Sequence, residues 1–233
     1  MKISIIIPVL NEREDLPPTL HALMQRIDIH EIIVVDGGST DGTREWLSRL
    51  PPRNVRFMEA TRGRGNQINV GANAASGEVC LFLHADTRLP TDALTQITVC
   101  LKDAKTEGGA FLLRFREARP WTLRVISTGI NLRTRLLRRA TGDQAIFSRK
   151  SSFSNTGGYP EWPLFEDVEF VTRLRRAGRF AILPSRITTS ARRYIAKGVL
   201  RTTALMFALQ AGYWCGVSPF RLQKWYRDVR ARH

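Results

Sequence analysis

The sequence EIIVVDGGSTDGT at residues 31–43 joins a run of β-branched residues directly to a polar loop rich in glycine. The run over residues 31–35 is typical of a strand that is covered on both faces. Asp36 stands where this strand ends, and the glycines after it would let a ligand approach the backbone closely. We therefore expect Asp36 to bind a ligand, whereas the positions of Ser39 and Asp41 favour a turn that caps the next helix.

Strand and helix patterns alternate on both sides of this segment. We expect further strands over residues 3–9, 55–58 and 79–83, and helices over residues 17–26, 43–50 and 66–75. This alternation predicts an α/β fold with a mostly parallel central sheet flanked by helices. Because ligands bind such sheets beyond the carboxyl ends of the strands, the four loops at that edge form the candidate site.

The alternation is less regular after residue 108. We expect strands over residues 113–116 and 145–148, and helices over residues 121–139, 166–177 and 219–232. Pro219 suits the first turn of the last of these helices, because a proline lacks the backbone donor that is unsatisfied there. We divide the chain into a main domain of residues 1–190 and a basic helical C-terminal extension of residues 191–233.

The composition is that of a folded protein. The chain has 233 residues, of which 43% are hydrophobic and 24% charged, so one compact domain with an extension fits and a disordered chain is excluded. Its three cysteines are widely separated and form neither a disulfide framework nor a metal-binding pair, which indicates a reducing compartment. The sequence shows no signal-peptide pattern and no apolar run of membrane-spanning length. We therefore expect a cytoplasmic protein.

Positive charge is concentrated in the second half. Residues 1–109 hold 12 Lys and Arg against 14 Asp and Glu, whereas residues 110–233 hold 24 against 7. This asymmetry indicates a phosphorylated substrate, an acidic membrane surface or nucleic acid as partner, although a basic surface that only keeps the chain in solution is equally consistent. No signature of a nucleic-acid-binding fold is present, so nucleic acid is not expected. A peripheral membrane contact would involve residues 197–232, on the inner face of the cytoplasmic membrane.

Two acidic segments are candidates for chemistry. Asp86 follows the strand at residues 79–83 and could hold Mg²⁺ or Mn²⁺, and the imidazole of His84 favours Mn²⁺. A turn capped by Asp86 is the alternative. Glu166 and Asp167 open a helix, where mutual repulsion can raise a pKa and suit a general base. Acids are also favoured in any first helical turn, so both interpretations stay open.

Taken in order, these segments resemble the family-2 glycosyltransferases of the GT-A fold. The resemblance rests on residues 4–12, 31–43, 66–77 and 82–86 and on the pair Glu166-Asp167, within residues 1–185. The C-terminal stretch from Arg192 to Arg227 is similar to a small bacterial subgroup found near radical-SAM and selenium-associated genes.

The resemblance implies that the donor is a nucleotide-diphosphate sugar, with UDP as the expected nucleotide. It makes residues 1–109 the nucleotide-binding half and residues 110–190 the acceptor half. It implies that the donor is bound by Pro8, Asn11, Glu12, Asp36, Arg62, Asn66 and Asp86. A divalent metal, Mn²⁺ or Mg²⁺, would be held by Asp86 and His84. Asp167 would be the general base with Glu166 beside it, and the acceptor would contact Gly142, Asp143, Gln144 and Trp162.

The chain departs from the family pattern at three points. His84 takes the place of the first acid of the Asp-x-Asp motif, which leaves the identity of the metal and the need for it open. Gly37 replaces an acid that commonly stands beside Asp36. The Gln-x-x-Arg-Trp motif of processive polymer synthases is absent, which favours one sugar per turnover.

The expected reaction is therefore an inverting, metal-assisted transfer of one sugar to an unknown acceptor. A sugar-phosphate nucleotidyltransferase is a second hypothesis, although the glycine-rich, lysine-containing N-terminal loop expected for one is missing. A non-catalytic binder of RNA or anionic membrane is a third. It predicts salt-sensitive binding that does not depend on Asp36, Asp86 or Asp167.

Overall fold

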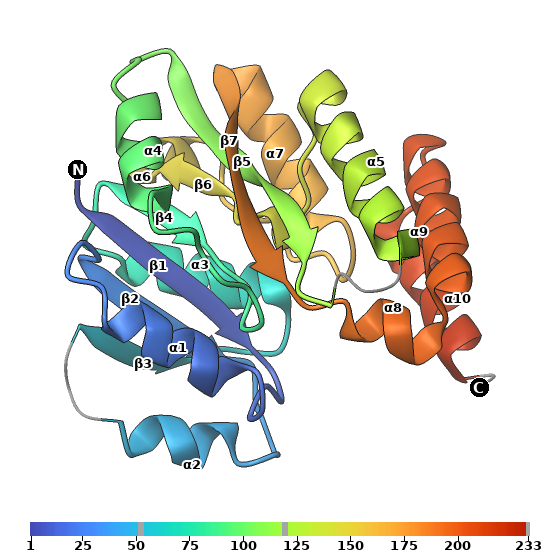
Figure 1. The fold of residues 1–233 in the computed structure, drawn as a ribbon, viewed down its shortest axis with the longest axis horizontal. Helices are drawn as coiled ribbons and strands as arrows, with labels where there is room; N and C mark the ends of the chain where they lie inside the picture. The colour runs from blue at the N-terminus through green and yellow to red at the C-terminus, as the bar shows by residue number, and fades with distance from the viewer. Residues whose placement is uncertain (51–53, 118–120, 232–233) are drawn as a thin grey trace.

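A seven-stranded sheet runs through the computed structural model, which describes residues 1–50, 54–117 and 121–231 (Figure 1). The order of the strands is β3-β2-β1-β4-β6-β5-β7. Their bounds are β1 Ile3–Val9, β2 Glu31–Asp36, β3 Val55–Glu59, β4 Val79–Phe82, β5 Thr106–Phe115, β6 Phe147–Arg149 and β7 Arg179–Thr189. Only β6 runs antiparallel to its neighbours β4 and β5, which confirms the mostly parallel sheet.

Helices cover both faces of this sheet. They are α1 Leu16–Met24, α2 Thr43–Ser48, α3 Arg64–Ala74, α4 Ala93–Cys100, α5 Trp121–Leu137, α6 Lys150–Asn155, α7 Glu166–Ala177, α8 Arg192–Lys197, α9 Val199–Trp214 and α10 Pro219–Ala231. Apolar side chains of α1, α2, α4 and α5 share one buried cluster, and those of α3, α6 and α7 share the other. The expected helix end at Arg232 lies outside the described residues.

Successive residues of the interior strand β1 are buried on opposite faces of the sheet. Ile5 and Ile7 belong to the cluster under α1, whereas Ile6 belongs to the cluster under α3, and all three are fully buried. Removing one such side chain from water stabilises the fold by about 1.5–3 kcal/mol. The central strand therefore needs apolar residues at successive positions, as the sequence indicated.

The last strand, β7, was not expected. Its sequence RFAILPSRITT contains Pro184 and exposed charged residues, a combination that argues against a central strand. Because β7 is the edge strand of the sheet, beyond β5, a proline is tolerated there. The helix α4 was also missed, since residues 93–100 were left without a predicted element.

The predicted C-terminal extension forms α8, α9 and α10. Figure 1 shows α9 beside α5 and α10 beside α9, at the end of the molecule opposite β3. Arg192 of α8 reaches back to the N-terminal half, where it forms ion pairs with Glu12 and Asp15. Within the described residues, no helix combines the length and apolar character that crossing a membrane requires. The division at residue 190 remains a prediction.

Candidate active site

The loops after β1 and β2 are joined to each other by hydrogen bonds. The N–H of Asn11 donates to Oγ of Ser39 (2.9 Å), and the N–H of Thr40 donates to Oδ1 of Asn11 (2.8 Å). Asn11 adopts a left-handed backbone with φ 56°, which asparagine tolerates better than most residues. The loops expected to hold the nucleotide therefore form one preorganised edge.

Asp36 serves this edge with both of its oxygens. Oδ2 accepts hydrogen bonds from the N–H groups of Gly38 (2.8 Å) and Ser39 (2.9 Å), and Oδ1 accepts one from Oγ of Ser39. The side chain is 1% exposed, so the turn that was expected for its neighbours also uses Asp36 itself. As predicted for Asp41, its carboxylate binds the N–H of Thr43 (3.0 Å) at the start of α2.

The glycine beside Asp36 has a packing reason. A Cβ on Gly37 would lie 2.9 Å from Cδ of Gln67, whose amide donates to the carbonyls of Val9 (2.7 Å) and Val35 (2.8 Å). Gln67 thus ties the ends of β1 and β2 together and leaves no room for a side chain at residue 37. The sequence did not single out Gln67, which reads as one polar residue of a helix.

The remaining predicted donor residues occupy different settings. Glu12 is ion-paired with Arg192 (2.8 Å), and Asn66, in the first turn of α3, donates to Thr61 in the loop before that helix. Pro8 lies inside β1, paired with Val35 of β2, and Arg62 is exposed at the rim. Their roles toward a donor stay predictions.

A second group of side chains meets between β4, α7 and the 3₁₀ turn at Gly142–Gln144. A Cβ on Gly142 would lie 3.0 Å from Nε2 of His84 and 3.2 Å from Oδ2 of Asp167. Asp143 is close enough to Asp86 to raise the pKa of that carboxyl. The structure therefore places Asp167 and His84 beside Gly142, and Asp143 near Asp86, although these residues lie up to 83 positions apart in the sequence.

Asp167 has the electrostatics of a general base. Burial and the charge of Glu166 raise the pKa of Asp167 to about 6, although Gly142 and Val168 donate N–H bonds to its oxygens (2.5 and 2.7 Å). A carboxyl whose pKa lies near the pH of the reaction is a more effective general base than a carboxyl with an ordinary pKa. Phe165, just before this pair, has a left-handed φ of 64°, and such strain is concentrated at functional sites.

Glu166 and Glu169 are engaged elsewhere. Glu166 is buried and forms an ion pair with Arg64 at the start of α3 (3.2 Å). Burial alone would lower the pKa of Arg64, but the carboxylates of Glu166, Asp167 and Asp143 together raise it. Arg64, rather than Arg62, is thus the cation beside these acids. The sequence could not distinguish the two arginines, because they lie only two positions apart. Glu169 binds Arg173 (2.9 Å).

Asp86 offers one carboxylate ligand for a divalent cation, which is only part of the set that such a cation needs. Its carboxylate accepts hydrogen bonds from the hydroxyls of Thr87 (3.3 Å) and Thr189 (3.4 Å), and burial raises its pKa above the ordinary value. Arg116 binds the main-chain carbonyl of Asp86 instead of the carboxylate (2.8 Å). Within the described residues no three His, Cys, Asp or Glu side chains are grouped to hold a metal. A cation at Asp86 and His84 therefore fits only if substrate oxygens complete its coordination.

Two residues expected on the acceptor side differ in placement. Gln144 is fully buried, and its amide binds Thr134, Thr141 and the carbonyl of Phe111, so it supports the turn and does not face an acceptor. Trp162 is partly exposed and packs edge-on against Tyr213 of α9.

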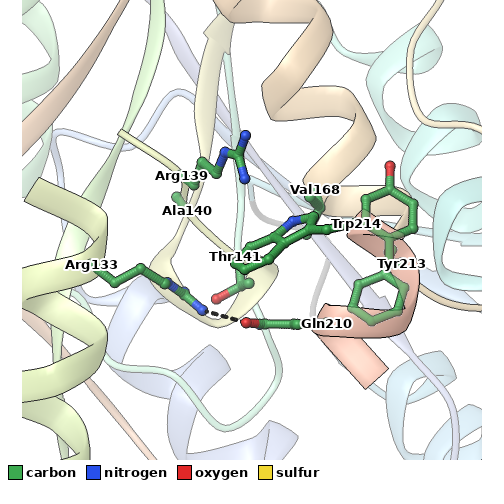
Figure 2. Close-up of a pocket in the computed structure, with 9 residues that line it drawn as sticks. Arg133, Arg139, Ala140, Thr141, Val168, Gln210, Tyr213 and Trp214 are labelled. Atoms are coloured by element: carbon green, nitrogen blue, oxygen red, sulfur yellow. Dashed lines mark hydrogen bonds between the residues drawn. The ribbon is translucent and has the colours of Figure 1, made fainter. Parts of the chain in front are cut away.

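A pocket opens beside Asp167, between α5, α7 and α9 (Figure 2). Thr141 and Val168, the chain neighbours of Gly142 and Asp167, form part of its wall. Figure 2 shows Arg133 donating to Gln210 across this pocket, a bond of 3.2 Å. The remaining walls are Arg139, Ala140, Phe165, Tyr213 and Trp214. Sequence reasoning missed this pocket, because its walls come from helices far apart in the chain.

The comparisons with known proteins agree with this geometry. The sequence profile of Glycosyl transferase family 2 matches residues 4–153. A PGL/p-HBAD biosynthesis glycosyltransferase of Mycobacterium bovis (strain BCG) is 30% identical over 165 residues, 67% of this chain and 62% of the relative. The undecaprenyl-phosphate 4-deoxy-4-formamido-L-arabinose transferase of Serratia proteamaculans is 28% identical over 60% of this chain and 44% of the relative. This chain thus spans less than two thirds of these relatives.

Solved structures of low sequence identity share the fold. Residues 1–349 of S. aureus TarS in complex with UDP-GlcNAc superpose with a TM-score of 0.67 at 20% identity, over 82% of this chain and 59% of that fragment. The mannosyltransferase PcManGT from Pyrobaculum calidifontis, with GDP-Man and Mn²⁺, gives 0.66 at 20% identity, over 90% and 62%. The fold is therefore GT-A, and, with a profile match over more than half of its length, the chain belongs to glycosyl transferase family 2.

Proposed function

We propose that this protein transfers one sugar from a nucleotide-diphosphate sugar to an acceptor hydroxyl. The carrying observation is the position of Asp167, a carboxyl with a pKa raised to about 6, which meets Gly142 together with His84 and directly precedes Val168 in the pocket wall. UDP is the proposed nucleotide, supported by the UDP-GlcNAc that TarS holds, whereas the GDP-Man held by PcManGT makes GDP the competitor to test.

The reaction is a single displacement. The oxygen of the acceptor hydroxyl forms a bond to the anomeric carbon while the bond from that carbon to the diphosphate oxygen breaks. The hydroxyl proton passes to the carboxylate of Asp167, and the nucleoside diphosphate leaves. One displacement inverts the configuration at the anomeric carbon. Such a base contributes typically about 10²–10⁴-fold to the rate.

The surrounding residues prepare this base. The N–H of Gly142 holds one oxygen of Asp167, which leaves the other oxygen, shared with the N–H of Val168, as the proton acceptor. Arg64 balances the charge of Glu166, so that two adjacent carboxylates coexist without protonation of both. A divalent cation held by Asp86 and His84 would neutralise charge on the departing diphosphate.

A thermal-shift titration tests the donor site. UDP, GDP, UDP-glucose and UDP-N-acetylglucosamine are each added with and without Mn²⁺. A ligand at 100 times its dissociation constant stabilises the fold by about 2.7 kcal/mol, which is readily measured as a rise in Tm. We expect a rise with UDP ligands that is larger with Mn²⁺ and smaller in Asp86→Ala. No rise with any nucleotide would contradict the proposed function.

A further inference from the structure

Exposed apolar side chains are concentrated on α5 and on the C-terminal helices α8, α9 and α10. Of the 14 large hydrophobic residues that are exposed in the described part of the chain, 11 belong to α5, α8, α9 and α10. They are Trp121, Val125, Leu132, Leu136, Leu137, Ile195, Leu200, Phe207, Trp214, Phe220 and Trp225. Single exposed hydrophobic residues are ordinary, but a concentration of this kind marks an interaction surface.

The outward face of α9 is apolar along its length. Leu200 is 79% exposed and Phe207 is 67% exposed, and Ala204 and Ala211 are exposed between and after them. This spacing of four, three and four residues places the side chains on one face of a helix. Leu209 is buried on the opposite face. In α9, therefore, one apolar side packs against the protein, and the other apolar side is left uncovered by the described part of the chain.

The outward face of α5 repeats this pattern. Trp121, Val125, Leu132 and Leu136 are 56–73% exposed and lie at spacings of four, seven and four residues, again one side of a helix. Leu123 is buried against the sheet on the opposite side.

The two stripes and α10 form one layer. Arg133 of α5 donates to Gln210 of α9, and each residue lies between the buried and exposed faces of its helix. On the other side of α9, a Cβ on Gly212 would lie 2.9 Å from Leu222 of α10. Figure 1 shows the three helices side by side. We name the outward side of α5, α9 and α10, with its exposed residues, the helical face.

Charge identifies what the helical face meets. Its exposed rim is basic and includes Arg124 of α5, Arg201 of α9, and Arg221 and Lys224 of α10. No Asp or Glu occurs in the sequence between residues 121 and 142 or between residues 170 and 227. Apolar side chains ringed by long cations suit a bilayer, because the apolar groups enter the acyl boundary while the cations meet anionic headgroups.

We propose that the helical face docks on an anionic lipid bilayer. The pocket beside Asp167 lies between α5, α7 and α9, two of which carry the helical face, so docking brings the pocket to the membrane surface. Its consequence for catalysis rests on the proposed function: the acceptor is a membrane-held molecule whose hydroxyl reaches Asp167 from the lipid side. Binding to the bilayer itself does not depend on that function.

Vesicle flotation of the purified full chain, without any donor, measures the docking. We expect binding to vesicles of phosphatidylcholine with phosphatidylglycerol, and at least tenfold weaker binding to pure phosphatidylcholine or at high salt. The double variant Leu200→Glu, Phe207→Glu should lose at least tenfold in binding and keep its Tm, because both side chains are exposed. Arg221→Gln with Lys224→Gln should weaken binding by about tenfold or more.

The matched control is Val99→Glu, an apolar residue that is 59% exposed on α4, outside the helical face, and it should bind vesicles as the wild type does. Trp121, Trp214 and Trp225 supply a second readout, since brominated lipid should quench their fluorescence. Absence of vesicle binding would overturn the proposal, as would binding that survives the Leu200, Phe207 double substitution. So would a dimer in light scattering that the double variant dissociates, because the face would then bind a second copy.

The same measurement separates this proposal from the catalytic one. Asp167→Asn should bind vesicles normally, so loss of activity without loss of binding concerns the function alone. Loss of binding with nucleotide-induced stabilisation intact concerns the helical face alone.

Discussion

The carboxylates in the loops after β1 and β2 differ from those after β4 and at α7 in what they bind. Asp36 and Asp41 accept hydrogen bonds from the N–H groups of their own turns. Burial alone would raise the pKa of Asp41, but hydrogen bonds from Thr43 and Arg13 hold it below its ordinary value. Asp86 and Asp167, by contrast, have raised pKa values, mainly because of burial.

This difference separates acids that shape the fold from acids that remain reactive. An acid whose oxygens are saturated by backbone donors gains stability as an anion and has little tendency to take a proton. A buried acid beside another carboxylate is less stable as an anion and binds protons or cations more readily. Both groups follow strands or open helices, so their sequence contexts look alike. The predictions below test this division, from the largest expected effect to the smallest.

Asp167→Asn should reduce kcat by about 10²–10⁴-fold, because the amide cannot accept the hydroxyl proton. Donor binding, measured by the nucleotide-induced rise in Tm, should not change. The matched control is Glu169→Gln, on the same turn of α7, whose carboxylate binds Arg173 and the pocket residue Tyr213 and has no hydrogen bond to Gly142. Near-normal turnover in Asp167→Asn would remove the base assignment.

Asp86→Ala should weaken donor and metal binding together, by about 10–100-fold, the range found when groups that support a metal site are lost. Titration of UDP at several Mn²⁺ concentrations measures both affinities. Asp92→Asn, at the start of α4, is the control, since its carboxylate binds Ser185 and Gln96. Equal losses in both variants would show that the effect is a general change of charge.

Activity should fall about tenfold per pH unit below pH 6, because only ionised Asp167 accepts a proton and its pKa is raised to about 6. Its pKa in the unfolded chain is about 3.9, so the folded state binds more protons between these values. The contribution of Asp167 to stability is therefore full below pH 4 and is lost as the pH rises through 6. The Tm of Asp167→Asn minus the Tm of the wild type should accordingly increase from pH 4 to pH 7, because only the wild type loses this contribution. A difference that does not change with pH would contradict the raised pKa.

Asp36→Asn should lower the free energy of unfolding by about 1–2 kcal/mol, since a buried anion that accepts three hydrogen bonds becomes neutral. Urea unfolding without any ligand measures this. Glu59→Gln is the control, because Glu59 is largely exposed in its ion pair with Arg44 and surface pairs contribute little. Full stability with lost nucleotide binding would instead make Asp36 a ligand-binding residue only.

Gly142→Ala should lower kcat by about three- to tenfold, as the new Cβ would press on His84 and Asp167 and displace the base by tenths of an ångström. The nucleotide-induced rise in Tm should persist. Gly129→Ala, at an open position on α5, is a control that should leave kcat unchanged. Unchanged kcat in Gly142→Ala would show that the close contact of Gly142 with His84 and Asp167 does not position the base.

Most of the sheet could be predicted because its strands are buried on both faces. Runs such as Ile3–Val9 and Glu31–Asp36 are nearly continuous in apolar residues, and this pattern does not depend on distant contacts. The edge strand β7 escaped prediction because a proline and charged residues are tolerated only at an edge, and edge position is a property of the assembled sheet. For the same reason Arg64 and Arg62 could not be told apart before α3 was placed against α7.

The sequence by itself determined the α/β class, the family resemblance and the acids at the carboxyl edge of the sheet, because these depend on local periodicity and on motifs in chain order. Only the tertiary structure decided which acids are reactive. Besides burial, the pKa of Asp167 is set by the charges of Glu166 and Arg64 and by the hydrogen bond from Gly142, and the last two residues are distant in sequence. The helical face is likewise tertiary: each helix is amphipathic or apolar alone, and the unpaired side becomes visible only after the other side has packed.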